Sequence, residues 1–153
     1  MFSQTVEYAM RAVLALAAGD GSPMTTRQIA EIMKVPQSYL SKVLQSLVRA
    51  GLVFSTRGLK GGFVLVRGAD EITLLEILNS VHPLQRIESC PLDLESHSSA
   101  LCPLHRRLDQ AMGSVEKAFA STTLAEILSE ENPCPTLQEQ LKVLAPGEDK
   151  SDS

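Results

Sequence analysis

Apolar residues recur at intervals of three and four over the first third of the chain, which is the spacing of amphipathic helices. The pattern predicts helices over residues 3–18, 26–33 and 36–50. Thr25 and Gln28 have the spacing of a capping box, which would begin the second helix. We expect the buried faces of the three helices to comprise Val6, Met10, Val13, Leu14, Ala17, Ile29, Ala30, Met33, Leu40, Val43, Leu44 and Leu47.

The spacing then changes to that of strands. Residues 52–56 and 62–66 are predicted to pair as a hairpin around the glycine-rich, basic segment 57–61. The order helix, helix, turn, helix, strand, hairpin, strand is that of a winged helix-turn-helix. The predicted fold is therefore mainly α with a small β-hairpin wing, followed by a long C-terminal helix.

That C-terminal helix is predicted over about residues 103–120, after a short capped helix that begins at Thr73. Its apolar residues step by four, four, three and four, as in a coiled-coil seam that joins two copies of a chain. We expect a DNA-binding domain over 1–82, a ligand or sensor loop over 83–102, a dimerisation region over 103–130 and a partly disordered tail over 131–153. The expected dimer interface comprises Leu104, Leu108, Met112, Val115 and Phe119.

The composition agrees with a folded protein of the cytoplasm. The chain has 153 residues and is 44% hydrophobic, and no apolar run approaches the roughly 18 residues of a membrane span. The sequence shows no signal-peptide pattern, so we expect a cytoplasmic protein without membrane contact. In that compartment its three cysteines are expected to be free thiols or metal ligands before they are structural disulfides.

The charge is divided between two halves. Residues 1–70 carry a net charge of +4 and residues 71–153 a net charge of −8. Six basic residues and no acidic one lie between Lys34 and Ala69. A basic half on an acidic protein indicates a polyanion partner, although a solvated face with segregated charge is an alternative.

The winged helix-turn-helix and this charge point to double-stranded DNA. The third helix would enter the major groove, and the basic wing would contact phosphate or the minor groove. A winged helix used for protein contacts is the alternative. The residues expected to contact DNA are Thr26, Gln37, Ser38, Tyr39, Ser41, Lys42, Gln45, Arg57 and Lys60.

Five segments carry a resemblance to a known family. They are Glu7–Ala9, Tyr39–Val53, Ser55–Gly58, Gly61–Phe63 and Ile72–Leu74. Together they resemble the Rrf2 family of bacterial transcription regulators, of the IscR, NsrR, RirA and CymR kind, over about residues 1–120. The resemblance implies a homodimer whose long helices cross and whose two recognition helices bind a palindromic operator.

The resemblance also implies a cofactor. Many members of the family bind an iron–sulfur cluster through Cys-x5-Cys-x5-Cys, followed in the IscR type by a histidine. Here Cys90, Cys102 and His105 keep the outer positions, Ser96 replaces the central cysteine and His97 stands beside it. A 2Fe–2S cluster would then be held by Cys90, Cys102 and His105. His97 is a weaker candidate ligand, and so is Glu7, because some relatives complete the site with an acid at this place from the partner subunit.

The cysteines can also be interpreted from their neighbours. Proline after Cys102 predicts this cysteine at a helix N-cap, where the helix dipole favours the thiolate, with His105 one turn along the same side. Three alternatives stay open: a metal or 2Fe–2S site, a redox pair that forms a Cys90–Cys102 disulfide, or two loop cysteines without a role. Cys134 is expected to be a bystander.

The function expected from the sequence is DNA-binding transcriptional regulation, as a repressor switched at the 90–105 loop. An enzyme is not expected, because the chain has no Cys-x-x-Cys, phosphate loop or nucleophile elbow. The alternative is a cofactor-free regulator or interaction module that responds to a small metabolite.

Overall fold

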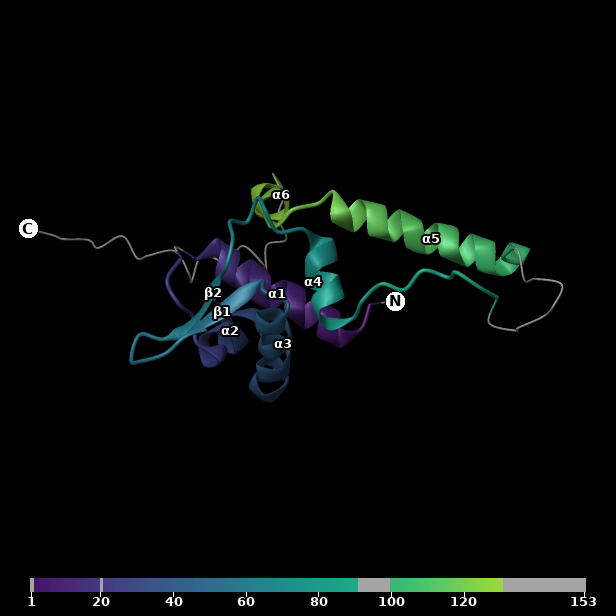
Figure 1. Cartoon of the computed structure of the whole chain (residues 1–153). Coiled ribbons are helices and arrows are strands. Elements are labelled where there is room, and N and C mark those ends of the chain that lie inside the picture. Colours follow the sequence, from purple (N-terminus) through teal and green to yellow (C-terminus); the bar gives the residue numbers. More distant parts are fainter. Residues whose placement is uncertain (1, 20, 91–99, 131–153) are drawn as a thin grey trace, which may run out of the picture.

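The computed structural model describes residues 2–19, 21–90 and 100–130. The predicted fold class is confirmed: the described part is mainly helical, with one antiparallel two-stranded hairpin (Figure 1). The elements are α1 (Gln4–Ala18), α2 (Thr26–Met33), α3 (Gln37–Arg49), β1 (Val53–Thr56), β2 (Gly62–Leu65), α4 (Leu74–Val81), α5 (Pro103–Ala120) and α6 (Leu124–Ser129).

Side chains at the helix starts explain several of these boundaries. The predicted capping boxes at Thr25 and Thr73 are both formed, and Thr123 begins a third one at α6. In each box the threonine hydroxyl accepts from a backbone N–H that the helix leaves without a partner. Pro36 is the N-cap of α3, so this helix begins one residue later than the predicted position 36.

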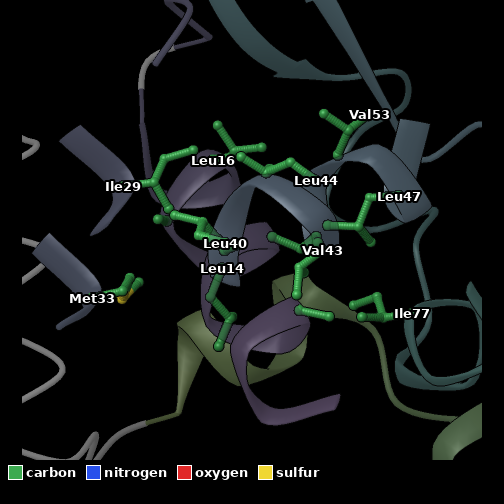
Figure 2. Close-up of a cluster of buried hydrophobic side chains, with 14 of the residues drawn as sticks. Leu14, Leu16, Ile29, Met33, Leu40, Val43, Leu44, Leu47, Val53 and Ile77 are labelled. Atoms are coloured by element: carbon green, nitrogen blue, oxygen red, sulfur yellow. The ribbon is translucent and has the colours of Figure 1, made fainter. Parts of the chain in front are cut away.

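The core forms around α1 and α3, and Figure 2 shows the side chains that fill it. The four apolar residues predicted for α3 are all buried. On α1 the prediction is incomplete, because Met10 and Ala17 are half-buried, whereas Ala9, Ala12 and Ala15 are fully buried. The reason is that α1 contacts α2, α3, α4, α6 and β2, so burial extends around most of the helix. Alanine allows this close approach of neighbouring elements.

The hairpin is attached to the body of the protein at its second strand. Val53 pairs with Leu65 and Thr56 with Gly62 in the antiparallel register. Met24 and Phe63 exchange two backbone hydrogen bonds, of 3.0 and 2.8 Å. A Cβ on Gly62 would lie 2.6 Å from the Met24 backbone, so this approach requires glycine.

Helix α5 extends away from the other helices (Figure 1) and has no buried residue. Its predicted bounds, 103–120, are confirmed, with Cys102 at the N-cap and Pro103 in the first turn. After α5 the chain returns to the body at α6, where Leu124 is fully buried and its N–H donates to Ile72 O. No helix in the described ranges is long and apolar enough to cross a membrane.

Candidate functional site

Helix α3 presents the polar side chains that the sequence predicts as DNA contacts. Its apolar face is packed on α1, so the opposite face is left to solvent. Lys34, with a φ of 54°, makes the sharp turn between α2 and α3. Thr26, the first residue of α2, is half-buried. The predicted residues of α3 that are exposed are Gln37, Ser38, Tyr39, Ser41, Lys42 and Gln45.

Tyr39 is held by α1 as well as exposed to solvent. Its hydroxyl lies 2.6 Å from Thr5 Oγ1, and its ring meets Tyr8 edge-on with centroids 5.5 Å apart. The sequence analysis did not find this contact, because the partners are 34 residues apart and carry no shared motif. The contact fixes the first turn of α3 against α1. Tyr39 therefore has a structural role in addition to its predicted contact with DNA.

The wing places further basic groups beside α3. Arg57 and Lys60 are exposed in the segment between β1 and β2, and Leu59 between them is fully exposed. A shallow hollow between α3 and the hairpin is lined by Gln45, Val48, Arg49, Ser55 and Phe63. Arg49 was not among the predicted contacts, although its place in the acid-free basic run was a usable signal.

Arg67, also in the basic run, is paired within the chain. It donates to Glu76 at 2.6 Å and to Glu71 O at 3.0 Å. Burial opposes ionisation of Glu76, but hydrogen bonds from Thr73 and Arg67 outweigh it and hold the Glu76 pKa below its usual value. Arg67 therefore stabilises the start of α4, whereas Lys42 on α3 and Arg57 and Lys60 on the wing, which are among the predicted contacts, are exposed.

Cys90, Cys102 and His105 come together at the start of α5. Their candidate donor atoms all lie within 4.8 Å of one another. The Nδ1 atom of His105 is 3.1 Å from Cys102 Sγ and 3.8 Å from Cys90 Sγ. Cys90 is buried and the other two are half-buried. Two thiols and an imidazole are a donor set that iron and zinc both accept.

Two weaker candidate ligands remain, and Glu7, the one that the structure describes, is not part of this group. Glu7 lies on α1 and forms an ion pair with Arg11 of the same helix. His97, Ser96 and Cys134 fall outside the described residues, as does the predicted tail. The described part of one chain thus brings three candidate donors together.

The segment before Cys90 is fixed to α5 by one arginine. Arg86 donates from Nε and Nη2 to the two carboxylate oxygens of Asp109, both at 2.7 Å, and from Nη1 to Glu116 at 3.0 Å. The N–H of Ile87 adds a 3.0 Å bond to Asp109. Arg86 and the Ile87 N–H together lower the Asp109 pKa to about 2. No sequence motif joins these residues.

The predicted interface residues of α5 are exposed to different degrees. Leu104 is 65% exposed and Leu108 is 47% exposed. Met112, Val115 and Phe119 are half-buried, and Phe119 stacks on Phe2 with ring centroids 5.3 Å apart. In the described part of one chain, the first two residues of this apolar series are therefore exposed and the other three are only partly covered.

The comparisons with known proteins agree with this arrangement. The Rrf2 family, described as iron-dependent transcriptional regulators, matches residues 2–130. The chain belongs to the Rrf2 family. A relative from Aquifex aeolicus (strain VF5), which carries the name of an HTH-type transcriptional regulator, is 28% identical over 132 residues, or 84% of this chain and 92% of the relative.

Two solved structures of Rrf2-like regulators are similar in fold. CymR of B. subtilis, named the global cysteine regulator of that organism, has a TM-score of 0.70 and 29% identity, and covers 84% of this chain and 96% of its own. IscR of T. potens has a TM-score of 0.68 and 26% identity, and the match covers 84% of this chain and 85% of IscR. The protein is therefore a winged-helix, DNA-binding transcriptional regulator of the Rrf2 family and not an enzyme.

Proposed function

We propose that this Rrf2 regulator acts as a homodimer on a palindromic operator and is switched by the chemistry of Cys90, Cys102 and His105. We further propose that it is a repressor that works in the cytoplasm, bound to the nucleoid. The single observation that supports the DNA-reading part is the exposed polar face of α3 beside a basic wing, in a segment without an acid. In a repressor this face would bind the operator and block transcription.

The homodimer is supported by the apolar series on α5. An exposed apolar stripe at coiled-coil spacing is stabilised when a second copy covers it, and a two-fold axis makes the two surfaces identical. A two-fold dimer would also place its two α3 helices to read successive major grooves, which matches a palindromic site.

The switch is supported by the three clustered donors. Cys90, Cys102 and His105 would hold iron, as a 2Fe–2S cluster or another iron centre, with Glu7 of the partner subunit or His97 as further candidates. When bound, such a centre supplies sensitivity to oxidants and to iron supply. In the population-shift description, occupancy changes operator affinity by about five- to 150-fold, a coupling of about 1–3 kcal/mol.

A thiol switch is the second candidate, favoured by the same proximity. The two Sγ atoms lie within 4.8 Å, so a modest approach would form a disulfide. The two thiols would lose two protons and two electrons to a peroxide, whose O–O bond breaks to give water and an alcohol or a second water. Of the relatives, CymR is named for cysteine, which makes a thiol signal a reasonable candidate here.

The DNA-binding surface is tested with operators selected from random duplexes by the wild-type protein. Replacing Lys42 and Arg57 by alanine removes one cation from α3 and one from the wing. We expect a loss of operator affinity and a salt slope that falls by about one for each phosphate contact removed. Lys117→Ala, which removes a cation from the C-terminal turn of α5, is the matched control. Unchanged affinity and slope in the double variant would exclude this surface.

The switch is tested on protein purified without oxygen, by iron and acid-labile sulfide per chain and by the visible spectrum. Equal iron and sulfide with a brown chromophore would support a cluster, and Cys90→Ala should abolish it. A colourless, iron-free protein that resists reconstitution would remove the cluster. Mass spectrometry after peroxide treatment would then show whether Cys90 and Cys102 pair.

A further inference from the structure

The segment from His82 to Cys90 joins α4 to the thiol site. It begins at the C-cap of α4 and has no helix or strand. Near its start, Leu84 N donates to Asn79 Oδ1 at 3.0 Å. Beyond that point and before Cys90, Arg86 and Ile87 hydrogen-bond to α5. These contacts decide where the segment places the Cys90 thiol.

The segment lies antiparallel to α5. Arg86 contacts Asp109 and Glu116, whereas Cys90 lies beside His105 and Cys102, nearer the start of that helix. Asp109 and His105 are four residues apart and so share one helix face. The three residues that follow Ile87, up to Cys90, can span at most about 10 Å. A bond at Asp109 therefore limits Cys90 to the neighbourhood of His105, one turn earlier.

A glycine in α5 fits the same contact. A Cβ on Gly113 would lie 3.0 Å from Arg86 Nη1 and 3.1 Å from Cζ, so the guanidinium rests on the bare face of this residue. Glycine in a helix interior costs about 0.5–1 kcal/mol relative to alanine. The close approach of Arg86 gives a physical reason for glycine here.

We propose that Arg86, held by Asp109 over Gly113, is a positioning residue that places the Cys90 thiol against His105 and Cys102 for metal binding. This inference rests on the thiol site of the proposed function and assigns it a support that is remote in sequence. Without the bidentate bond, Cys90 would occupy a wider volume, and ordering it would oppose binding. Groups that orient metal ligands in this way change metal affinity by about 10- to 100-fold.

The test uses Co²⁺ as the probe on the reduced full-length protein without oxygen. Thiolate-to-cobalt bands report the binding, and we compare wild type, Arg86→Gln, Arg86→Lys and Asp109→Asn. We expect affinity to fall about tenfold or more for Arg86→Gln and Asp109→Asn, and less for Arg86→Lys. A variant that combines Arg86→Gln with Asp109→Asn should lose little more Co²⁺ affinity than either single variant, because both substitutions remove the same contact. Arg107→Gln, an exposed charge on the same helix, is the matched control and should bind as wild type does.

A second measurement separates positioning from general stability. Alkylation of the metal-free protein, followed by mass spectrometry, should be faster at Cys90 in Arg86→Gln and unchanged at Cys102. Gly113→Ala adds a methyl under the guanidinium while favouring the helix. It should weaken Co²⁺ binding and speed Cys90 alkylation although thermal stability does not fall.

The outcomes distinguish this inference from the proposed function. If wild type binds Co²⁺ and the folded Arg86 and Asp109 variants match Arg107→Gln, the positioning inference is wrong and the metal site stands. If wild type shows no cobalt bands, the metal function fails, and Cys90 alkylation alone then decides the positioning. Equal alkylation rates in wild type, Arg86→Gln and Gly113→Ala would overturn it.

Discussion

Helices α3 and α5 carry equally regular apolar series but use them differently. In α3, Leu40, Leu44 and Leu47 are fully buried among side chains from α1 and α2. In α5, which is longer, no residue is buried, and Leu104 is 65% exposed. The first series is fully covered within the chain, whereas the second is exposed at Leu104 and Leu108 and only partly covered beyond them.

The difference divides the molecule into a part with its own buried core and a part whose apolar residues need a further contact for burial. The part formed by α1 to α4, the hairpin and α6 has a buried core of its own. The α5 arm is held along its length by Arg86, which pairs with Asp109 and Glu116, and by contacts with α4, and the chain returns to the body at α6 beyond its end. Covering one exposed leucine contributes about 1.5–3 kcal/mol. A second copy on the α5 stripe is therefore the contact that would stabilise the arm.

The largest effect is expected from charges placed on that stripe. Replacing Leu104 and Leu108 by glutamate would oppose two carboxylates to their copies across the two-fold axis. We expect a monomer by sedimentation, and operator affinity lower by about 10²–10⁴-fold because two linked contacts become one. The circular dichroism spectrum of the variant should still show a folded helical protein, because α1 to α4 do not contain the substituted residues.

The control for this prediction is a similar change on the exposed side of α5. Gln110→Glu adds a carboxylate to an exposed polar position and should leave the dimer intact. A double variant that stays dimeric and binds its operator normally would show that α5 is not the dimer contact. The uncovered series would then need another partner.

The next largest effect is expected in the core, at the buried apolar face of α3. Leu44→Ala removes a fully buried side chain from the centre of the cluster in Figure 2. We expect the free energy of unfolding to fall by about 2–5 kcal/mol, from lost burial and the cavity that remains. Urea denaturation measures it.

The comparison variant is Leu104→Ala in protein diluted below its dimerisation range. Because Leu104 is largely exposed in one chain, its loss should change the unfolding free energy by less than about 0.5 kcal/mol. A large effect at both positions would mean that α5 is already packed within one chain. The contrast between the two helices would then be wrong.

The sequence predicted the helices well because local signals determine them. Apolar spacing gave α3 and α5, and side chains three residues apart gave the capping boxes at Thr25 and Thr73. Apolar spacing alone does not predict which element packs on the apolar face of a helix. The difference in burial between α3 and α5 therefore follows only from the fold. The extent of burial on α1 was also missed, since it depends on how many elements surround that helix.

In the candidate site, too, local contacts could be predicted from the sequence and tertiary contacts could not. Cys102 and His105 are neighbours on one helix, so their proximity follows from spacing. The approach of Cys90 was expected from the family resemblance. The contacts of Arg86 with Asp109 and of Tyr39 with Thr5 join residues 23 and 34 positions apart. They depend on tertiary packing and have no local signal.

A smaller effect is expected where the arm meets the body. Thr123→Ala removes the hydroxyl that accepts from Glu126 N at 3.3 Å and so weakens the start of α6. Loss of such a cap costs about 0.5–2 kcal/mol, seen as a lower urea midpoint. Ser121→Ala is the matched change, because that hydroxyl donates to Ala118 O at the end of α5 and caps no helix start. Equal effects of the two variants would contradict the capping role.

The smallest effect concerns the acid sensitivity of the arm. Asp109 has a pKa lowered to about 2 from 3.8, chiefly by its bonds with Arg86. A carboxyl whose pKa is depressed by folding adds stability above its unfolded pKa and loses it as the pH falls through the folded value. Arg86 stays charged throughout, because the same bonds raise its pKa further.

The stability that Asp109 adds should therefore be complete above about pH 4 and gone near pH 2. Glu116 also faces Arg86, so Asp109→Asn leaves one ion pair in place. Urea midpoints of metal-free wild type and Asp109→Asn should differ at neutral pH and converge between pH 4 and pH 2, and salt should reduce the difference because Arg86 is exposed. A difference that persists unchanged to pH 2 would show that Asp109 acts through packing and not through its charge.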